Sequence, residues 1–238
     1  MNVTLAQIAP RLSRINLENI ISIINDHKHN SDLIVFPELS LNGYLLQDKL
    51  YEDAWNISEL EVLKDLSKSI DIIVGGAIKD ENVFRNSALY FSKGKLLSQH
   101  NKVHLPNYGM FEEARYFEAG NVFESFQTDH GKVSMLVCED LWHSSVHNAL
   151  IKENPDLIIA LVASPARGFT DNGLDIEKKW VKIISQVSTE CNAKLIFVNR
   201  VGFEDGLGFW GGSCVLDASA NIIEKLPHYK EVIKTITI

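Results

Sequence analysis

The chain has 238 residues, of which 45% are hydrophobic and 23% charged, a composition typical of a soluble globular protein. Its formal net charge of −8 argues against nucleic acid or an anionic membrane surface as the main partner. The N-terminus lacks the charged and apolar regions of a signal peptide, and no apolar run is long enough to span a bilayer.

Apolar strands alternate with helical patterns along the chain, which predicts an α/β fold. Strands in which almost every residue is apolar are expected where helices or a second sheet cover both faces. No linker or low-complexity segment divides the chain, so we expect a single domain over residues 1–238. The predicted strands cover residues 2–8, 32–37, 71–78, 87–92, 95–99, 132–137, 156–163, 194–199, 213–217 and 231–238, and the predicted helices cover 15–24, 60–70, 141–152 and 176–191.

Several polar residues follow directly after predicted strands. In α/β sheets, functional side chains gather at the carboxyl ends of the strands. Glu38, Cys138 and Ser164 all lie at such ends. Residues 102–120 contain proline and glycine and are predicted to be a long loop.

Cys138 stands where an apolar strand ends and an acidic turn leads into a helical pattern. A thiol on such an elbow has the position of a nucleophile, and a nearby helix N-terminus favours the reactive thiolate. The alternative is that Cys138 is a small buried hydrophobic residue. The three cysteines are odd in number and form no CxxC pair, which suggests reduced thiols and a cytoplasmic location.

Glu38 and Lys102 are candidates to act together with Cys138 in acyl transfer. A thiol that attacks an amide needs a base to accept its proton and return it to the leaving amine, a role open to Glu38. The oxyanion of the tetrahedral intermediate needs positive charge, which Lys102 and the backbone N–H after Cys138 could supply. Taken singly, Glu38 could instead cap a helix and Lys102 could be a solvated surface residue.

Six short segments, in order over nearly the whole chain, resemble the signatures of the nitrilase, or carbon–nitrogen hydrolase, superfamily. Three are similar to its glutamate, lysine and cysteine motifs, one to its N-S-A strand and two to its late segments. The resemblance implies a four-layer α-β-β-α sandwich, a homodimer or larger assembly, and no metal or organic cofactor. The six segments are residues 36–44, 85–88, 102–106, 137–140, 198–202 and 211–217.

The resemblance also implies roles for individual residues. Glu38 would be the general base, Lys102 the oxyanion stabiliser and Cys138 the nucleophile. Glu113 resembles the family's second, supporting glutamate, with its neighbour Glu112 as the alternative for that position. The residues expected to bind substrate are Tyr44, Glu139, Trp142, Ser164 and Arg167.

Residues 105–109, 111–117 and 138–142 are most similar to the glutaminase domains of glutamine-dependent NAD synthetases. The chain departs from those enzymes because it stops at Ile238 and has no Gly-rich pyrophosphatase loop. We therefore expect a free-standing amidase that cleaves a small, linear, non-peptide amide through a thioester and releases ammonia. The alternatives are a glutaminase subunit that supplies ammonia to a separate synthetase, and a catalytically silent interaction module with the same fold.

The loops at 45–55 and 165–174, which no motif decodes, are expected to choose the acyl group. Arg167 could pair a substrate carboxylate with its bidentate fork, but the polar loop around it favours a solvated surface arginine. Trp142 could line a pocket or pack in the core.

Two pairs of histidines, His100 with His104 and His143 with His147, have the i,i+4 spacing of zinc ligands. The first pair lies in a strand-to-loop segment and the second lacks the glutamate of a metalloprotease motif, so we predict no metal site. A cysteine–histidine mechanism with His104 or His143 as the base is a further alternative, but it leaves the glutamate and lysine motifs unexplained.

Residues 206–211 match the GxGxxG pattern of dinucleotide-binding proteins. That fingerprint requires a helix after the glycines, whereas residues 213–217 have the pattern of a strand. We expect these glycines to let a loop approach the mouth of the site rather than to bind a dinucleotide.

Overall fold

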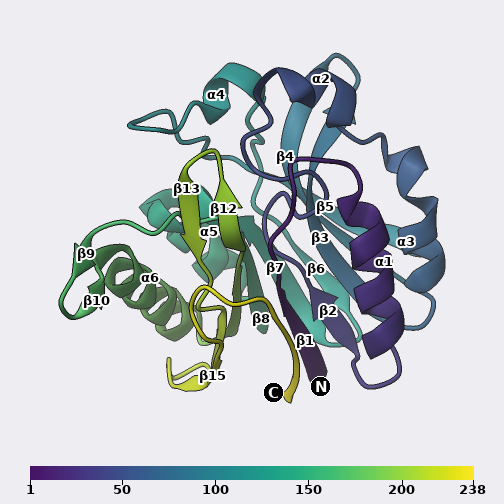
Figure 1. The fold of residues 1–238 in the computed structure, drawn as a ribbon. Coiled ribbons are helices and arrows are strands. Elements are labelled where there is room, and N and C mark those ends of the chain that lie inside the picture. The colour runs from purple at the N-terminus through teal and green to yellow at the C-terminus, as the bar shows by residue number, and fades with distance from the viewer.

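The computed structural model describes residues 1–238 and shows two six-stranded sheets stacked between outer layers of helices (Figure 1). This arrangement confirms the predicted α-β-β-α sandwich. In spatial order, the first sheet contains β16 (Val232–Thr237), β1 (Asn2–Gln7), β2 (Leu33–Val35), β3 (Asp71–Asp80), β4 (Val83–Ser92) and β5 (Lys95–Asn101). The second contains β15 (Ile222–Lys225), β14 (Cys214–Leu216), β11 (Lys194–Asn199), β8 (Leu157–Val162), β7 (Gly131–Val137) and β6 (Ser125–Thr128).

The remaining elements cover the sheets and one end of the sandwich. The helices are α1 (Asn16–His27), α2 (Leu50–Asp53), α3 (Glu61–Leu66), α4 (Glu113–Tyr116), α5 (Ser144–Glu153) and α6 (Asp175–Cys191). Two small hairpins consist of β9 (Phe169–Thr170) with β10 (Gly173–Leu174), and of β12 (Val201–Glu204) with β13 (Leu207–Trp210). Short 3-10 helices cover Gln47–Lys49, Ile57–Leu60 and Cys138–Trp142.

An apolar layer between the two sheets forms the centre of the molecule. Val3 and Leu5 of β1 and Val35 of β2 share one packed cluster with Val137 of β7 and Ile159 of β8. On the outer sides, α1 and α3 cover the first sheet, and α5 and α6 cover the second (Figure 1). Because both of its faces are covered, β8 is buried at every residue, as its continuous apolar sequence predicts.

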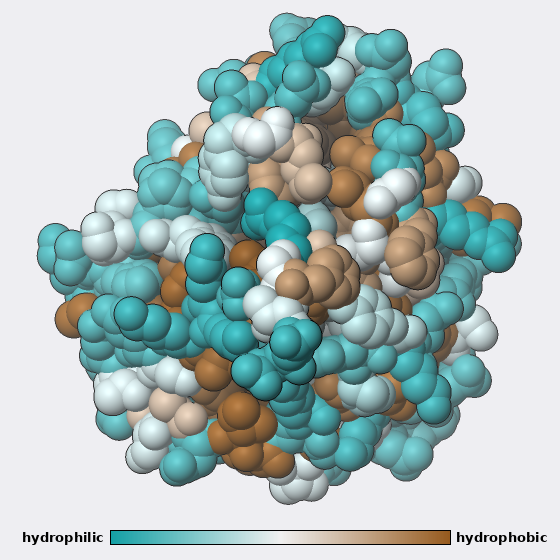
Figure 2. All heavy atoms as spheres, turned by 60° about the vertical axis from the view of Figure 1, so that its left-hand side comes forward, coloured by the Kyte–Doolittle hydropathy of each residue, from teal (hydrophilic) through white to brown (hydrophobic).

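The two long helices follow the apolar spacing of their sequences. Ile20 and Ile24 are buried one turn apart in α1, and Trp180, Ile184 and Val187 form the buried side of α6. The face of the molecule that carries α6 is mostly hydrophilic, with apolar residues in small separate groups (Figure 2). None of the helices has the length and apolarity that crossing a membrane requires.

The carboxyl ends of several strands meet at one end of the sandwich, away from the chain termini at the bottom of Figure 1. β2 is parallel to β3, and β5 points the same way because two antiparallel pairings connect it to β3. β7 and β8 are parallel in the other sheet. Glu38 follows β2, Lys102 follows β5, Cys138 follows β7, and Ser164 lies just beyond β8. The architecture thus places four predicted site residues at the same end.

Some local predictions are wrong. Residues 206–211 were expected to form a loop, but most of them lie in the β12–β13 hairpin, and no helix follows. The helix after Cys138 begins only at Ser144, because a 3-10 helix intervenes. The predicted loop 102–120 contains the short helix α4. The edge strands β6 and β15 lacked a sequence signal because each has only four residues and none of them is buried.

The fold makes a prediction about two adjacent glycines in β3. A Cβ at Gly75 would lie 2.6 Å from the backbone oxygen of Pro37 and from the backbone nitrogen of Leu39, on either side of Glu38. A Cβ at Gly76 would meet the end of the Leu41 side chain at 2.9 Å, and that side chain can move. We expect Gly75→Ala to lower the free energy of unfolding by about 1–3 kcal/mol, the scale of overpacking, and Gly76→Ala by less. Urea unfolding measures both, and equal losses would contradict the expectation.

Candidate functional site

Glu38 lies in a tight turn after β2, where Leu39 adopts a left-handed conformation with φ 50°. Its carboxylate is fully buried and accepts three hydrogen bonds. Oε1 accepts hydrogen bonds from Lys102 Nζ at 2.7 Å and from Asn86 Nδ2 at 2.8 Å. Oε2 accepts one from the backbone N–H of Ala163 at 2.8 Å. Contacts from both sheets therefore fix the orientation of this carboxylate.

Lys102 lies between two carboxylates. Its ammonium is completely buried and donates to Glu38 and also to Glu113 Oε1 at 2.9 Å, with Glu113 Oε2 at 2.8 Å. Glu113 is the first residue of α4, and its Oε1 also accepts a hydrogen bond of 2.6 Å from the Tyr44 hydroxyl. The neighbouring Glu112 is exposed and forms only a loose surface pair with Arg115 at 3.7 Å. Of the two glutamates, Glu113 is thus the one that reaches the buried cluster.

The charges in this cluster support one another. Burial alone would lower the pKa of Lys102, but Glu113 and Glu38 outweigh it and hold that pKa well above its ordinary value. Burial raises the pKa of Glu113, and Glu38 contributes to the rise while Lys102 opposes it. Burial and Glu113 likewise raise the pKa of Tyr44. Lys102 therefore remains an ammonium ion and Tyr44 a neutral phenol that donates.

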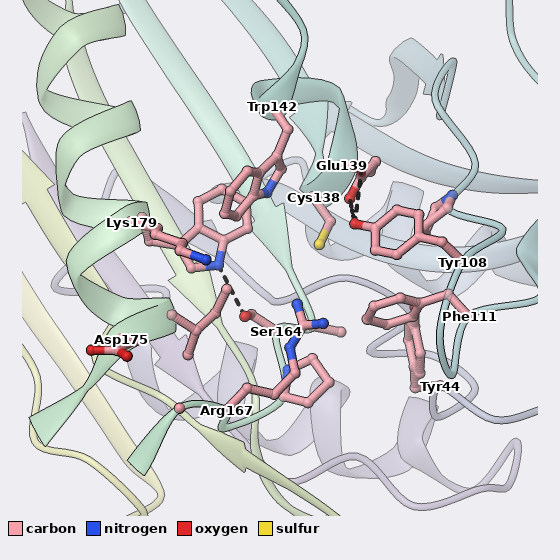
Figure 3. A pocket seen from close by; sticks show the side chains of 16 residues that line it. Tyr44, Tyr108, Phe111, Cys138, Glu139, Trp142, Ser164, Arg167, Asp175 and Lys179 are labelled. Carbon is pink, nitrogen blue, oxygen red and sulfur yellow. Dashed lines mark hydrogen bonds between the residues drawn. The ribbon is translucent and has the colours of Figure 1, made fainter. Parts of the chain in front are cut away.

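Cys138 follows the last residue of β7 and has a φ of 44°, a conformation that favours glycine. Holding a non-glycine residue there costs on the order of 1–3 kcal/mol, so the surrounding contacts must enforce it. The resulting elbow directs the sulfur into a pocket (Figure 3).

The protonation state of Cys138 differs from the sequence-based expectation. Burial raises the pKa of its thiol well above the ordinary value, and the Glu38 carboxylate raises it further, while Lys102 acts in the opposite direction. The expectation that a helix N-terminus favours the thiolate is therefore wrong. Only a short 3-10 helix follows the thiol, and the Glu38 carboxylate acts on it. The raised pKa keeps the Cys138 thiol protonated near neutral pH.

The pocket above the sulfur has a volume of about 420 Å³ and is lined by aromatic and charged side chains (Figure 3). All five residues expected to bind substrate line it. The lining residues are Tyr44, Pro106, Tyr108, Phe111, Cys138, Glu139, Trp142, Ala163, Ser164, Pro165, Arg167, Gly168, Asp175, Ile176, Lys179 and Trp180.

Existing contacts restrict three of the five expected binding residues. The Tyr44 hydroxyl is committed to Glu113, and Glu139 accepts a hydrogen bond of 2.9 Å from the Tyr108 hydroxyl. The Ser164 hydroxyl oxygen accepts a bond of 2.9 Å from the Trp180 indole, which leaves its proton free to donate into the pocket.

Arg167 is not the solvated surface arginine that its polar loop suggested. Its side chain is half-buried in the pocket wall, with the guanidinium carbon 5.2 Å from the centre of the Phe111 ring. It forms no ion pair, and its buried Nε has no hydrogen-bond partner. The wall of the pocket therefore contains a cation that is not paired with a protein carboxylate.

Sequence reasoning missed several residues around the pocket. Asn86, in the N-S-A segment, donates a hydrogen bond to Glu38. Its side chain is buried, which the sequence does not reveal. Asp175 and Lys179 enter the pocket from the first turns of α6, where charged residues at a helix start ordinarily face solvent.

The four paired histidines make other contacts. His104 stacks on His143 with ring centres 3.6 Å apart, which orients the two rings face to face. His100 Nε2 is 2.8 Å from Asp140 Oδ2, and His147 Nε2 is 2.8 Å from the backbone oxygen of Leu141. Neither i,i+4 pair thus points its nitrogens at a common centre.

Comparisons with known proteins agree with this geometry. The family model described as carbon-nitrogen hydrolase matches residues 2–238. A glutamine-dependent NAD(+) synthetase from Acinetobacter baylyi is 32% identical over 235 residues, which cover 96% of this chain and 42% of that protein. The structure of a glutamine-dependent NAD+ synthetase from Acinetobacter baumannii has a TM-score of 0.86 at 30% identity, over 98% of this chain and 44% of that chain. The chain thus spans less than half the length of these relatives.

An amidase of the nitrilase superfamily from Nesterenkonia shares the fold over a larger part of its own length. Its TM-score is 0.83 at 20% identity, and the match covers 99% of this chain and 89% of that one.

The raised pKa of Cys138 predicts how its alkylation depends on pH. Because the Glu38 charge raises this pKa, Glu38→Gln should lower the midpoint of the pH profile for iodoacetamide labelling of Cys138. Lys102→Met should raise the midpoint, since it removes a nearby cation. Mass spectrometry of the labelled peptide separates Cys138 from Cys191 and Cys214. Shifts in the same direction for both variants would contradict the assigned electrostatics.

Proposed function

The chain belongs to the carbon–nitrogen hydrolase family, and from this premise we propose that it cleaves the C–N bond of a small linear amide through a thioester on Cys138. The observation that carries the proposal is the buried cluster beside the thiol, in which one ammonium joins two carboxylates. Acyl transfer by a protonated thiol needs a base and an oxyanion partner, and Glu38 and Lys102 supply these groups.

Acylation begins when the Cys138 sulfur attacks the amide carbon and its proton passes to Glu38. The carbonyl oxygen becomes an oxyanion beside the Lys102 ammonium and the backbone N–H of Glu139. An ammonium has three N–H donors, so one remains for the oxyanion if Glu38 and Glu113 each take one. Collapse of the intermediate breaks the C–N bond, Glu38 returns the proton to the nitrogen, and ammonia leaves.

Deacylation repeats the same proton transfers with water as the nucleophile. Glu38 accepts a proton from water as its oxygen attacks the thioester carbon. The second tetrahedral intermediate expels the Cys138 sulfur, which recovers the proton from Glu38, and the carboxylic acid product is released. Glu113 and Tyr44 keep the Lys102 ammonium in place during both halves of the reaction.

The charges around the pocket suit an amide that also carries an α-amino acid group. Arg167 has no carboxylate partner in the protein, so it is available to bind a substrate carboxylate with two parallel hydrogen bonds. The Ser164 proton can add a third. Glu139 and Asp175 supply negative charge for a substrate ammonium. An ω-amide such as glutamine has both charges and a terminal carboxamide, and Trp142 offers an apolar wall to its methylene chain.

A second candidate function is the supply of ammonia to a separate synthetase. The resemblance to glutamine-dependent NAD synthetases favours it. Its chemistry at Cys138 would be identical up to the release of ammonia. An ammonia-release screen over glutamine, other ω-amides and N-carbamoyl compounds, with and without an added ammonia-dependent NAD synthetase, distinguishes the two functions.

The proposed roles predict how substitutions change turnover. Cys138→Ala and Glu38→Gln should both remove nearly all ammonia release while the protein stays folded, and Lys102→Met should slow acylation by about 10²–10³-fold. The double variant Glu38→Gln/Cys138→Ala should be scarcely less active than Cys138→Ala alone, because the two residues act as one unit. Cys191→Ala is the control, since its thiol is buried outside the pocket. Near-wild-type turnover in Glu38→Gln would overturn the mechanism. Labelling of all three cysteines at equal rates would favour an interaction module.

The substrate assignment predicts a selective effect at Arg167. Arg167→Gln should lower kcat/KM for glutamine by about 10–100-fold, the scale of a lost charge-assisted hydrogen bond, mainly through KM. For a neutral amide such as valeramide, kcat/KM should change less than about threefold. Arg115→Gln is the matched control because this arginine is exposed and pairs only with Glu112. Equal losses on both substrates would count against a carboxylate contact.

A further inference from the structure

A further buried carboxylate, Asp140, lies two residues after Cys138, and the proposed chemistry does not use it. Its side chain is completely buried and accepts four hydrogen bonds. Oδ1 binds the backbone N–H groups of Val103 at 3.0 Å and His104 at 2.9 Å. Oδ2 binds the backbone N–H of Val137 at 3.1 Å and His100 Nε2 at 2.8 Å. Burial would raise the pKa of Asp140, but His100 and the backbone donors outweigh it and hold the pKa below its ordinary value.

These four donors come from the two chain segments that carry the catalytic groups. Val103 and His104 follow Lys102 directly, and Val137 precedes Cys138. One carboxylate therefore joins the lysine segment after β5 to the elbow after β7, although these strands belong to different sheets. Such a link limits independent movement of Lys102 and Cys138.

The link also bears on the unfavourable conformation of Cys138. The bond from Val137 to Asp140 closes the backbone around this residue, whose φ of 44° needs external support. His100 is only 7% exposed and is tilted against Phe123, with ring centres 5.6 Å apart.

We propose that Asp140 and His100 are positioning residues that set the distance between the Lys102 ammonium and the Cys138 sulfur. This inference rests on the proposed amide hydrolysis for its kinetic readout. Asp140 holds both segments, and His100 orients Asp140 by donating to Oδ2. Neither residue lines the substrate pocket, so loss of the link lowers kcat rather than weakening substrate binding.

The His100 donor can be tested with two variants of similar size. His100→Gln keeps an N–H group close to the position of Nε2, whereas His100→Leu fills the site without a donor. We expect kcat to fall about 10–100-fold in His100→Leu, since displacements of about 1 Å cost up to 10²-fold. KM should change less than threefold, and His100→Gln should restore most of the loss. Equal kcat values in both variants, per active site titrated, would overturn the proposal.

A matched control is the half-buried His–Asp contact between the sheets, in which His130 Nε2 lies 3.3 Å from Asp71 Oδ2. Neither His130 nor Asp71 lines the pocket. His130→Leu should lower the thermal midpoint without changing kcat. If His100→Leu does not fold, His100→Ala serves instead, because a polar cavity of about 110 Å³ that His100 lines could admit imidazole. Millimolar imidazole should restore kcat in this variant, and failure to do so would contradict the proposal.

Failure of the proposed function has a different signature. If the wild-type protein releases no ammonia from any amide, the rate of Cys138 alkylation by iodoacetamide replaces kcat as the readout. The labelling rate should then decrease from the wild type to His100→Gln and further to His100→Leu, since the reactivity of the thiol depends on the placement of Lys102. Identical labelling rates in all three would remove the positioning role independently of the enzyme reaction.

Discussion

The placement of one ammonium between two buried carboxylates constrains the rest of this structure. Isolated charges in a protein interior are costly unless they are paired and their remaining hydrogen-bonding positions are filled. Lys102 pairs with Glu38 and Glu113, while Asn86 and the Ala163 N–H complete the first carboxylate and Tyr44 the second. These partners come from both sheets and from the segments around α4, so the two sheets must stack in one register for the cluster to be satisfied.

The same constraint explains which parts could be predicted from the sequence. Glu38, Lys102 and Cys138 each follow a strand, and the carboxyl ends of these strands lie at one end of the sandwich. Pattern and motif together could therefore predict that the three residues lie at the same end. Arg167 and the pKa of Cys138 were misjudged because both depend on burial by segments distant in sequence.

Elements with weak local signals were also missed. The two strands of the β12–β13 hairpin and the edge strands β6 and β15 each have four residues, which are too few to show a clear alternating pattern. The role of Asn86 and the bonds of Asp140 could not be inferred either, because a polar residue in a motif does not reveal whether its partner is water or a buried backbone amide.

In the proposed mechanism, the cluster also keeps its net charge constant while the thiol reacts. Before attack, the charges of Glu38, Glu113, Lys102 and the neutral Cys138 thiol sum to −1. After attack, Glu38 is neutral and the oxyanion carries its charge, so the sum is unchanged. The negative charge moves from one partner of the Lys102 ammonium to another, and the proton makes one short transfer. A buried site whose dipoles and ammonium are already oriented needs little rearrangement for this step, which is how preorganised charge lowers a barrier. A resting thiolate would add a further negative charge to the same buried site, which accounts physically for the raised pKa of Cys138.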